Sequence, residues 1–267
     1  MLAYPSTQQK KGITTDHSST KFLRYEATDI DERSVLEYQK EINETPGNRT
    51  TCLEILQNEL KNLKDLEPCL DEKFLLNFLR VSKFDTAKAF QRVLNYYKKF
   101  DVLTETYKKI SFSLQKAQDL RHICISPYRC ENNSFLVLGN CAIDYKKFTF
   151  AERFYLEILF VHELMENPIN QICGGTYVFD YEGFDIHGYL AYSPGWIRMF
   201  LDFLVNIFPC RLKALHIVNA PSLFLPIWKI AYPFLPKKIQ TRESGGYLHL
   251  RLGYKRECTE KSLYSLG

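Results

Sequence analysis

Residues 208–242 contain, in order, a strand, an apolar helix and a basic cluster. They read Phe208-Pro-Cys-Arg-Leu-Lys-Ala-Leu-His-Ile-Val-Asn-Ala-Pro221, then Ser222-Leu-Phe-Leu-Pro-Ile-Trp-Lys-Ile-Ala-Tyr-Pro-Phe-Leu-Pro-Lys-Lys-Ile-Gln-Thr-Arg242. The apolar part, residues 222–235, has Lys229 as its only charge, so a helix there must be covered on both faces or touch lipid. A helix of about 14 residues is too short for a bilayer core of about 30 Å. We predict a lid, bent by its prolines, that lies against a membrane surface and does not span it.

Positive charge is concentrated in the same part of the chain. Residues 208–256 contain nine Lys or Arg against one acid, Glu243, whereas the whole chain of 267 residues has a net charge of +4. This asymmetry favours an anionic partner, and the adjoining apolar helix favours a membrane surface over nucleic acid. The composition, 45% apolar and 25% charged, is that of a globular protein.

Cysteine usage and the N-terminal residues favour a cytoplasmic protein. The eight cysteines include no Cys-x-x-Cys pair and no metal-ligand spacing, which predicts reduced, buried thiols and no metal site. The first ten residues lack the apolar core of a secretory signal. We expect a cytoplasmic protein that visits membrane surfaces transiently.

Hydrophobic periodicity divides the chain into three parts. Residues 1–30 are polar and predict a disordered tail, residues 31–120 a small helical domain, and residues 121–267 a domain in which strands alternate with helices. The helices are expected at 31–44, 51–66, 71–80, 84–100, 150–165, 186–207 and in the lid; the strands are expected at 135–138, 174–180 and 214–219, with an edge strand at 247–252. This order predicts an α/β fold with a mostly parallel sheet and crossover helices behind an N-terminal helical domain.

Enzyme signatures are absent from the sequence. It contains no Gly-x-Ser-x-Gly elbow, no Gly-x-Gly-x-x-Gly or phosphate-binding loop, and no His-Glu-x-x-His. His162, His187 and His216 are interpreted as structural residues. We therefore predict a binding protein with no catalytic residues and no cofactor.

Surplus apolarity indicates a pocket. The helix predicted at 186–207 and the lid are both apolar on more than one face, which fits either a double-layered core or a cavity, floored by the sheet, that holds a largely hydrocarbon ligand. The residues expected to line the cavity are Phe179, Leu190, Phe200, Phe203, Leu204, Ile207, Val218, Phe224, Ile227, Trp228 and Ala231.

Three motifs carry a resemblance to a known family. Residues 71–85 resemble the helical lead-in of the CRAL-TRIO (Sec14-like) lipid-binding proteins, residues 175–183 resemble their central strand, and residues 208–242 are similar to their third strand and gate. The motifs follow the family's order over residues 35–242. The animal branch containing α-tocopherol transfer protein, the retinaldehyde-binding proteins and the clavesins is the most similar.

The resemblance implies a carrier of a hydrophobic lipid, such as a tocopherol, a retinoid or another isoprenoid, whose gate opens at a phosphoinositide-containing membrane. By position, the phosphoinositide contacts fall on Arg211, Lys213, Lys238 and Arg242, while a fifth basic position falls on Ser82, beside Lys83. After Arg242 the sequence departs from the family pattern, which implies a divergent or truncated end to the lipid domain. The alternative function is a membrane-recruited, phosphoinositide-binding scaffold or regulator with a vestigial pocket.

Overall fold

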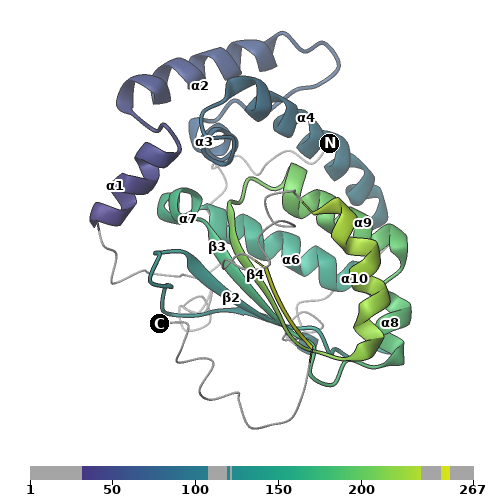
Figure 1. Cartoon of the computed structure of the whole chain (residues 1–267). Helices are drawn as coiled ribbons and strands as arrows, with labels where there is room; N and C mark the ends of the chain where they lie inside the picture. The colour runs from purple at the N-terminus through teal and green to yellow at the C-terminus, as the bar shows by residue number, and fades with distance from the viewer. Residues whose placement is uncertain (1–31, 108–118, 121, 236–247, 253–267) are drawn as a thin grey trace, which may run out of the picture.

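The first four helices of the described residues form a layer of their own. The computed structural model describes residues 32–107, 119, 120, 122–235 and 248–252. The helices are α1 (Glu32–Glu41), α2 (Pro46–Lys61), α3 (Glu72–Val81) and α4 (Thr86–Tyr107). They gather at one end of the molecule (Figure 1). Residues 74–80 of α3 are all buried, so this short helix is the centre of the layer.

Polar caps set the helix starts in this layer. The Oγ1 atom of Thr45 accepts a hydrogen bond from the amide of Asn48 at 3.2 Å, and Pro46 takes the first helical position, where no amide is needed. The predicted start of this helix at Thr51 was therefore wrong, because Thr45 and Pro46 begin a helix. Asp71 caps α3 as predicted, accepting from the amide of Phe74 at 3.0 Å.

The second layer is a five-stranded sheet. Its order is β1-β2-β3-β4-β5, with bounds β1 (Ile123–Ile125), β2 (Phe135–Asn140), β3 (Gly175–Asp180), β4 (Leu212–Ala220) and β5 (Leu248–Leu252). Only the β1–β2 pair is antiparallel. The predicted α/β fold with a mostly parallel sheet is confirmed, and the edge strand expected at 247–252 is present as β5.

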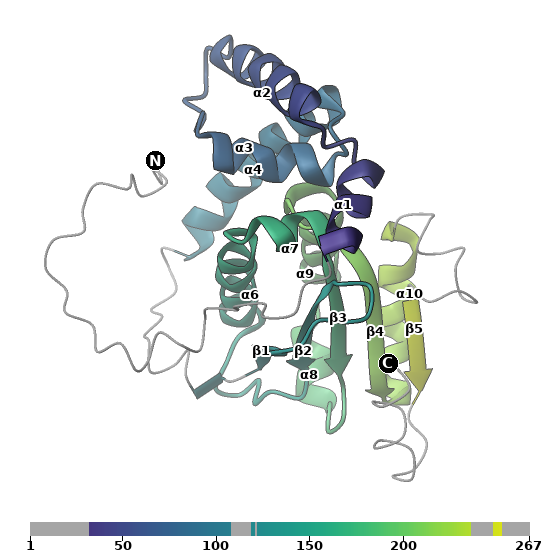
Figure 2. The ribbon, with the colours of Figure 1, turned by 90° about the vertical axis from the view of Figure 1, so that its left-hand side faces the viewer.

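Helices cover one face of this sheet. They are α6 (Phe150–Met165), α8 (Ile186–Ala191), α9 (Pro194–Asp202) and α10 (Leu225–Ala231), while α7 (Pro168–Cys173) leads into β3. Figures 1 and 2 show the four on the same side. From β2 to β5, each strand lies next to the strand that precedes it in the chain. When all crossovers between such parallel strands are right-handed, the connecting helices lie on the same face of the sheet.

The helix predicted over residues 186–207 is interrupted once and widens in its last turn, which corrects that prediction, while its end at Ile207 is confirmed. Pro194 has no amide hydrogen and forces Ser193 out of the helical region, to φ −64° and ψ 152°, so α8 ends and α9 begins across this step. After Asp202 the chain widens into a π-helical turn, η2 (Phe203–Ile207), closed by a hydrogen bond from the amide of Phe208 to the carbonyl of Phe203 at 2.8 Å.

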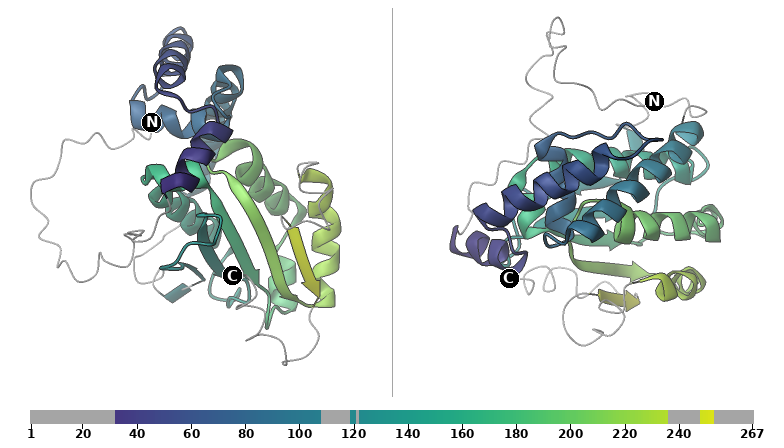
Figure 3. Two further views of the ribbon diagram at one scale, coloured as in Figure 1. Left: turned by 60° about the vertical axis from the view of Figure 1, so that its left-hand side comes forward. Right: turned by 90° about the horizontal axis from the view of Figure 1, so that it is seen from above.

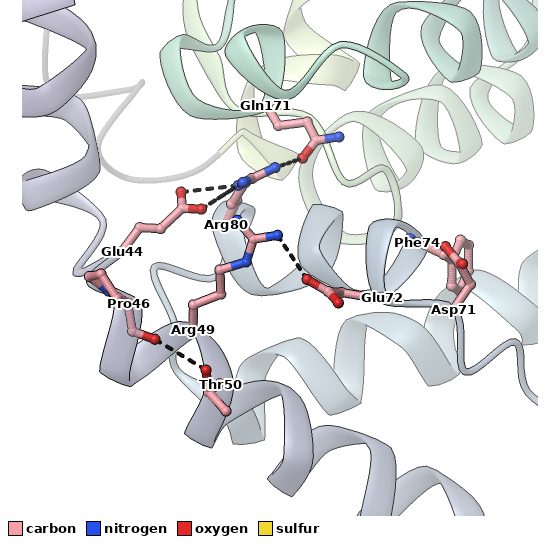
Figure 4. Close-up of polar contacts among 9 residues, drawn as sticks. All are labelled: Glu44, Pro46, Arg49, Thr50, Asp71, Glu72, Phe74, Arg80 and Gln171. Carbon is pink, nitrogen blue, oxygen red and sulfur yellow. Dashed lines mark hydrogen bonds and ion pairs between the residues drawn. The ribbon is translucent and has the colours of Figure 1, made fainter.

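Arginines join the helical layer to the sheet domain. Arg80 of α3 pairs with Glu44 at 2.6 Å and donates to Oε1 of Gln171 in α7 (Figure 4). Arg92 of α4 donates to the carbonyls of Val205 and Phe208, at 2.8 and 2.9 Å, which satisfies the C-terminal end of η2. Burial lowers the pKa of Arg92 to about 10. The two layers are therefore held together by charged, directional contacts as well as by apolar packing.

The Arg80–Glu44 pair gives a stability prediction. The two side chains are only 6% and 4% exposed, so Arg80→Ala leaves a buried carboxylate without a partner and lowers the free energy of unfolding by about 3–5 kcal/mol in urea titrations. Arg49→Ala is the matched control. It breaks the exposed Arg49–Glu72 pair, also drawn in Figure 4, and costs less than about 1 kcal/mol. Equal losses of unfolding free energy in the two variants would contradict the claim that the buried Arg80–Glu44 pair stabilises the fold more than the exposed pair does.

Candidate functional site

An aromatic layer lies between the sheet and its helices. Phe179 of β3 pairs in register with Ile217 of β4, so both side chains face the helices. The Phe179 ring is 6.5 Å from that of Phe200 in α9, and Phe154 of α6 is 5.2 Å from Phe203 of η2. These edge-to-face contacts form an apolar layer in the same packed cluster as the lid's buried side chains.

The lid is a short helix between two 3₁₀ turns. They are η3 (Ser222–Phe224), α10 (Leu225–Ala231) and η4 (Tyr232–Phe234), with Pro226 and Pro233 near the starts of α10 and η4. Phe224, Ile227 and Ala231 recur at helical spacing and are buried, and the Phe224 ring lies 4.4 Å from that of Tyr181. The outer face exposes Ile230 and Phe234. The lid is therefore apolar both toward the core and toward solvent.

Most of the predicted pocket residues lie together. The residues that belong to one packed apolar cluster are Phe179, Phe200, Phe203, Ile207, Phe224, Ile227, Trp228 and Ala231. Leu190, at 70% exposure, does not reach it, and Leu204 in the π-helical turn is half-buried outside it. Val218 pairs with Asp180, so it faces the opposite side of the sheet from Phe179. Near this point β4 presents Ile217, in register with Phe179, to the helices, and the strand's alternation could have identified it.

Two hollows on the described part of the molecule are lined by residues other than the predicted pocket residues. One, of about 390 Å³, lies between α9, η2 and η4 and is lined by Arg198, Leu201, Asp202, Asn206 and Phe234. A second of the same volume lies near residues 140–148. None of the predicted pocket residues lines either hollow, because their side chains pack against one another. Beside the first hollow the Arg198 guanidinium stacks over the Phe234 ring at 4.9 Å and holds the end of the lid to α9.

A buried polar network that sequence reasoning missed lies beneath the aromatic layer. Arg153 of α6 pairs with Glu157 at 2.9 Å and donates to the hydroxyls of Tyr145 and Tyr192. Burial opposes the charge on Arg153, but the Glu157 carboxylate outweighs it and the pKa of Arg153 is raised well above its usual range. The network fixes α6 against the α8–α9 break. In the sequence, only the i,i+4 spacing of Arg153 and Glu157 indicates it.

A basic cluster lies at the amino end of β4. Arg211 and Lys213, both predicted phosphoinositide contacts, lie beside Lys83 from the α3–α4 turn, and all three contact the carboxylate of Glu41 at the end of α1. Figure 2 shows α1 beside α7 at this end of the sheet. We call Lys83, Arg211, Lys213 and Glu41 the basic cluster.

The remaining predicted phosphoinositide contacts are not part of the basic cluster as the structure describes it. Lys238 and Arg242 lie outside the described residues. Ser82, where the fifth basic position was expected, caps the C-terminal end of α3, and Lys83 supplies the charge next to it. The guanidinium of Arg211 donates to the carbonyl of Ile172, and the ammonium of Lys213 lies 4.1 Å from the ring centroid of Tyr38.

Charge coupling in the basic cluster favours the ionised form of Glu41. Partial burial opposes the charge on Glu41, but the hydrogen bond from Lys83 and the charges of Arg211 and Lys213 outweigh it, and the pKa of Glu41 falls to about 2. Burial, with the neighbouring Arg211, lowers the pKa of Lys213. The cations repel one another, so their proximity depends on an anion.

Unusual backbone conformations bring these side chains together. Lys83 and Phe84 both have positive φ, 56° and 58°, in the left-handed region that non-glycine residues rarely adopt. Gly174 has φ +79°, and a Cβ atom there would lie 2.5 Å from the carbonyl oxygen of Arg211. Only glycine therefore allows β3 and β4 to approach at the point where Arg211 leaves the loop.

Comparison with known proteins identifies the sheet domain. Residues 122–243 match the family model of the CRAL/TRIO domain. This segment is similar to the CRAL/TRIO domain. It includes the aromatic layer, the lid, Arg211 and Lys213, whereas Lys83 and Glu41 come from the helical layer before it. Within the described residues, no helix combines the length and apolarity needed to cross a membrane.

Individual relatives are distant. The chain is 26% identical over 229 residues to alpha-tocopherol transfer protein-like of Homo sapiens, covering 80% of this chain and 63% of that protein. It is 25% identical over 219 residues to clavesin-1 of Mus musculus, covering 76% and 58%. The chain thus spans less than two thirds of the length of these relatives. The crystal structure of Sfh5 aligns with a TM-score of 0.36 at 14% identity, covering 84% of this chain and 82% of that one.

The approach of β3 and β4 at Gly174 gives a second prediction. Gly174→Ala lowers the free energy of unfolding by at least about 1–3 kcal/mol, because the backbone conformation is open almost only to glycine and the methyl group meets the Arg211 carbonyl. Gly47→Ala in α2 is the control, since no atom lies within 4 Å of the added Cβ, and it is expected to be neutral or stabilising. A Gly174→Ala variant as stable as the parent in chemical denaturation would contradict the close approach.

Proposed function

We propose that this protein carries an apolar lipid of the tocopherol, retinoid or other isoprenoid class, which enters the CRAL/TRIO domain beneath the lid at a phosphoinositide-containing membrane. The observation that carries the proposal is the lid itself. A helix buried on one side against an aromatic layer and exposing Ile230 and Phe234 on the other suits a part that closes over lipid and also touches a membrane. One relative's name, alpha-tocopherol transfer protein-like, supports the ligand class.

Ligand entry requires the lid to move. The predicted pocket side chains pack directly against one another, and α10 packs against α9. An isoprenoid chain would therefore take the place of lid side chains such as Phe224, whose ring lies against Tyr181. The lid's small number of polar side chains matches a ligand that is mostly hydrocarbon.

Membrane contact would supply the free energy for this movement. Ile230 and Phe234 lie beside exposed Lys229, an arrangement suited to the interface of an anionic membrane. The basic cluster is proposed to hold the phosphorylated inositol head group, since Arg211 and Lys213 present donors for phosphate oxygens.

A second function, a membrane-recruited scaffold with a vestigial pocket, is favoured by one observation. The two hollows of about 390 Å³ are lined by residues other than those of the predicted pocket. A scaffold binds phosphoinositide vesicles but moves no lipid between them.

Transfer of a fluorescent tocopherol analogue between vesicles tests the proposal. The full chain should accelerate transfer, and more so when the acceptor vesicles contain phosphatidylinositol bisphosphate. Ile230→Glu should lower this rate about tenfold or more, because it puts a charge on the membrane-facing side of the lid. Ile55→Glu, at a similarly exposed position of α2, should transfer as the parent does. Vesicle binding without transfer would favour the scaffold, and equal rates in the two variants would rule out the lid's role.

A further inference from the structure

The carboxylate of Glu41 occupies the centre of the basic cluster. Its Oε1 lies 3.0 Å from the ammonium of Lys83 and 3.0 Å from the guanidinium of Arg211, and its Oε2 lies 3.4 Å from the ammonium of Lys213. Three cations from two separate parts of the fold therefore converge on one carboxylate. This is the arrangement by which proteins hold a phosphate group, with a side chain of the protein itself as the anion.

The cations need an anion at this place. The side chains of Arg211 and Lys213 are only 9% and 13% exposed, so both have lost most of their hydration. Among the described residues, Glu41 is the one carboxylate that forms an ion pair with either of them. Removing it without a replacement would leave buried charges that repel one another.

Glu41 is nevertheless free to leave. It is the last residue of α1, and 41% of its side chain is exposed to solvent. The next turn is anchored independently, because Ile42 is fully buried and Glu44 is held by Arg80. Rotation of the Glu41 side chain toward solvent therefore opens the basic cluster without detaching α1 from the core.

We propose that Glu41 is a built-in competitor that determines which anionic head groups the basic cluster accepts. The inference rests on the head-group binding proposed above and adds its selectivity. A carboxylate supplies one negative charge, whereas a phosphomonoester supplies about 1.5–2 and three acceptor oxygens. A phosphorylated inositol ring displaces Glu41 and satisfies all three cations. The phosphodiester and carboxylate of phosphatidylserine offer no group of higher charge than the one they must displace.

Replacing Glu41 should change the preference of the protein for phosphoinositide over phosphatidylserine vesicles. Glu41→Gln keeps the side chain's size but removes the competing charge, so affinity should rise about five- to tenfold for phosphatidylserine vesicles, and less for vesicles containing phosphatidylinositol bisphosphate. The preference for phosphoinositide over phosphatidylserine then narrows. Glu37→Gln is the matched control, since it makes the same charge change on an exposed residue of the same helix.

The experiment compares the full-length parent, Glu41→Gln, Glu37→Gln and Lys213→Gln in flotation assays with phosphatidylcholine vesicles containing either anionic lipid. Soluble inositol trisphosphate, titrated by calorimetry, separates recognition of the phosphate groups from contact with a lipid surface. Thermal unfolding of each variant verifies folding, and Glu41→Asp, which keeps the charge, should retain the parent's preference if Glu41→Gln fails to fold.

The possible outcomes distinguish the competitor role of Glu41 from head-group binding by the basic cluster. Narrowed preference in Glu41→Gln but not in Glu37→Gln supports the inference. Parent-like preference in Glu41→Gln, with binding lost in Lys213→Gln, overturns the competitor role and leaves head-group binding intact. Absence of phosphoinositide binding in the parent overturns both. Tighter binding to soluble inositol trisphosphate in Glu41→Gln, with unchanged vesicle binding, would reject selection of lipid head groups.

Discussion

The parallel pairing of β3 with β4 is the constraint on which the remaining structure depends. It begins at Gly175 and Leu212, next to the close approach that Gly174 permits, and it runs through Phe179 and Ile217. One strand pair therefore presents charge at its amino end and apolar side chains in its middle, and delivers the chain to the lid at its other end. The basic cluster, the aromatic layer and the lid keep a fixed spacing because β4 contributes to the first two and leads directly into the third.

The helical layer is part of the same site. Its Arg80 and Arg92 bind to α7 and to the carbonyl groups around η2, and its Lys83 and Glu41 complete the basic cluster outside the CRAL/TRIO domain. Figure 3 shows α1 across the end of the sheet at which β3 and β4 begin. Loss of the helical layer would thus remove both a cation and the competing anion from the basic cluster, and not only apolar packing.

The sequence predicts much of the fold because its signals are local. Alternating strands and helices, the Asp71 cap and the apolar lid are each encoded within a few residues. The interruption between α8 and α9 could also have been predicted from Pro194, since proline disfavours the helical conformation for the residue before it. Two-residue alternation would have placed Ile217, and not Val218, on the face of the sheet that the helices cover.

The rest of the site depends on contacts between distant parts of the chain. Glu41 lies 170 residues before Arg211, and its spacing in α1 resembles that of any exposed helix glutamate. Lys83 reaches the basic cluster because Lys83 and Phe84 both adopt positive φ. The sequence gives no sign of this conformation, since neither residue is a glycine or an asparagine. Tertiary packing alone determines these positions.

The central claim is the proposal that the lid moves and an apolar lipid binds between it and the aromatic layer. Native mass spectrometry of the protein purified from the cells that make it tests this claim most directly. The account predicts one tightly held apolar lipid per chain, released by Trp228→Asp, which places a charge beside the buried ring of Phe224. A folded chain that binds phosphoinositide vesicles but never carries a lipid would contradict it.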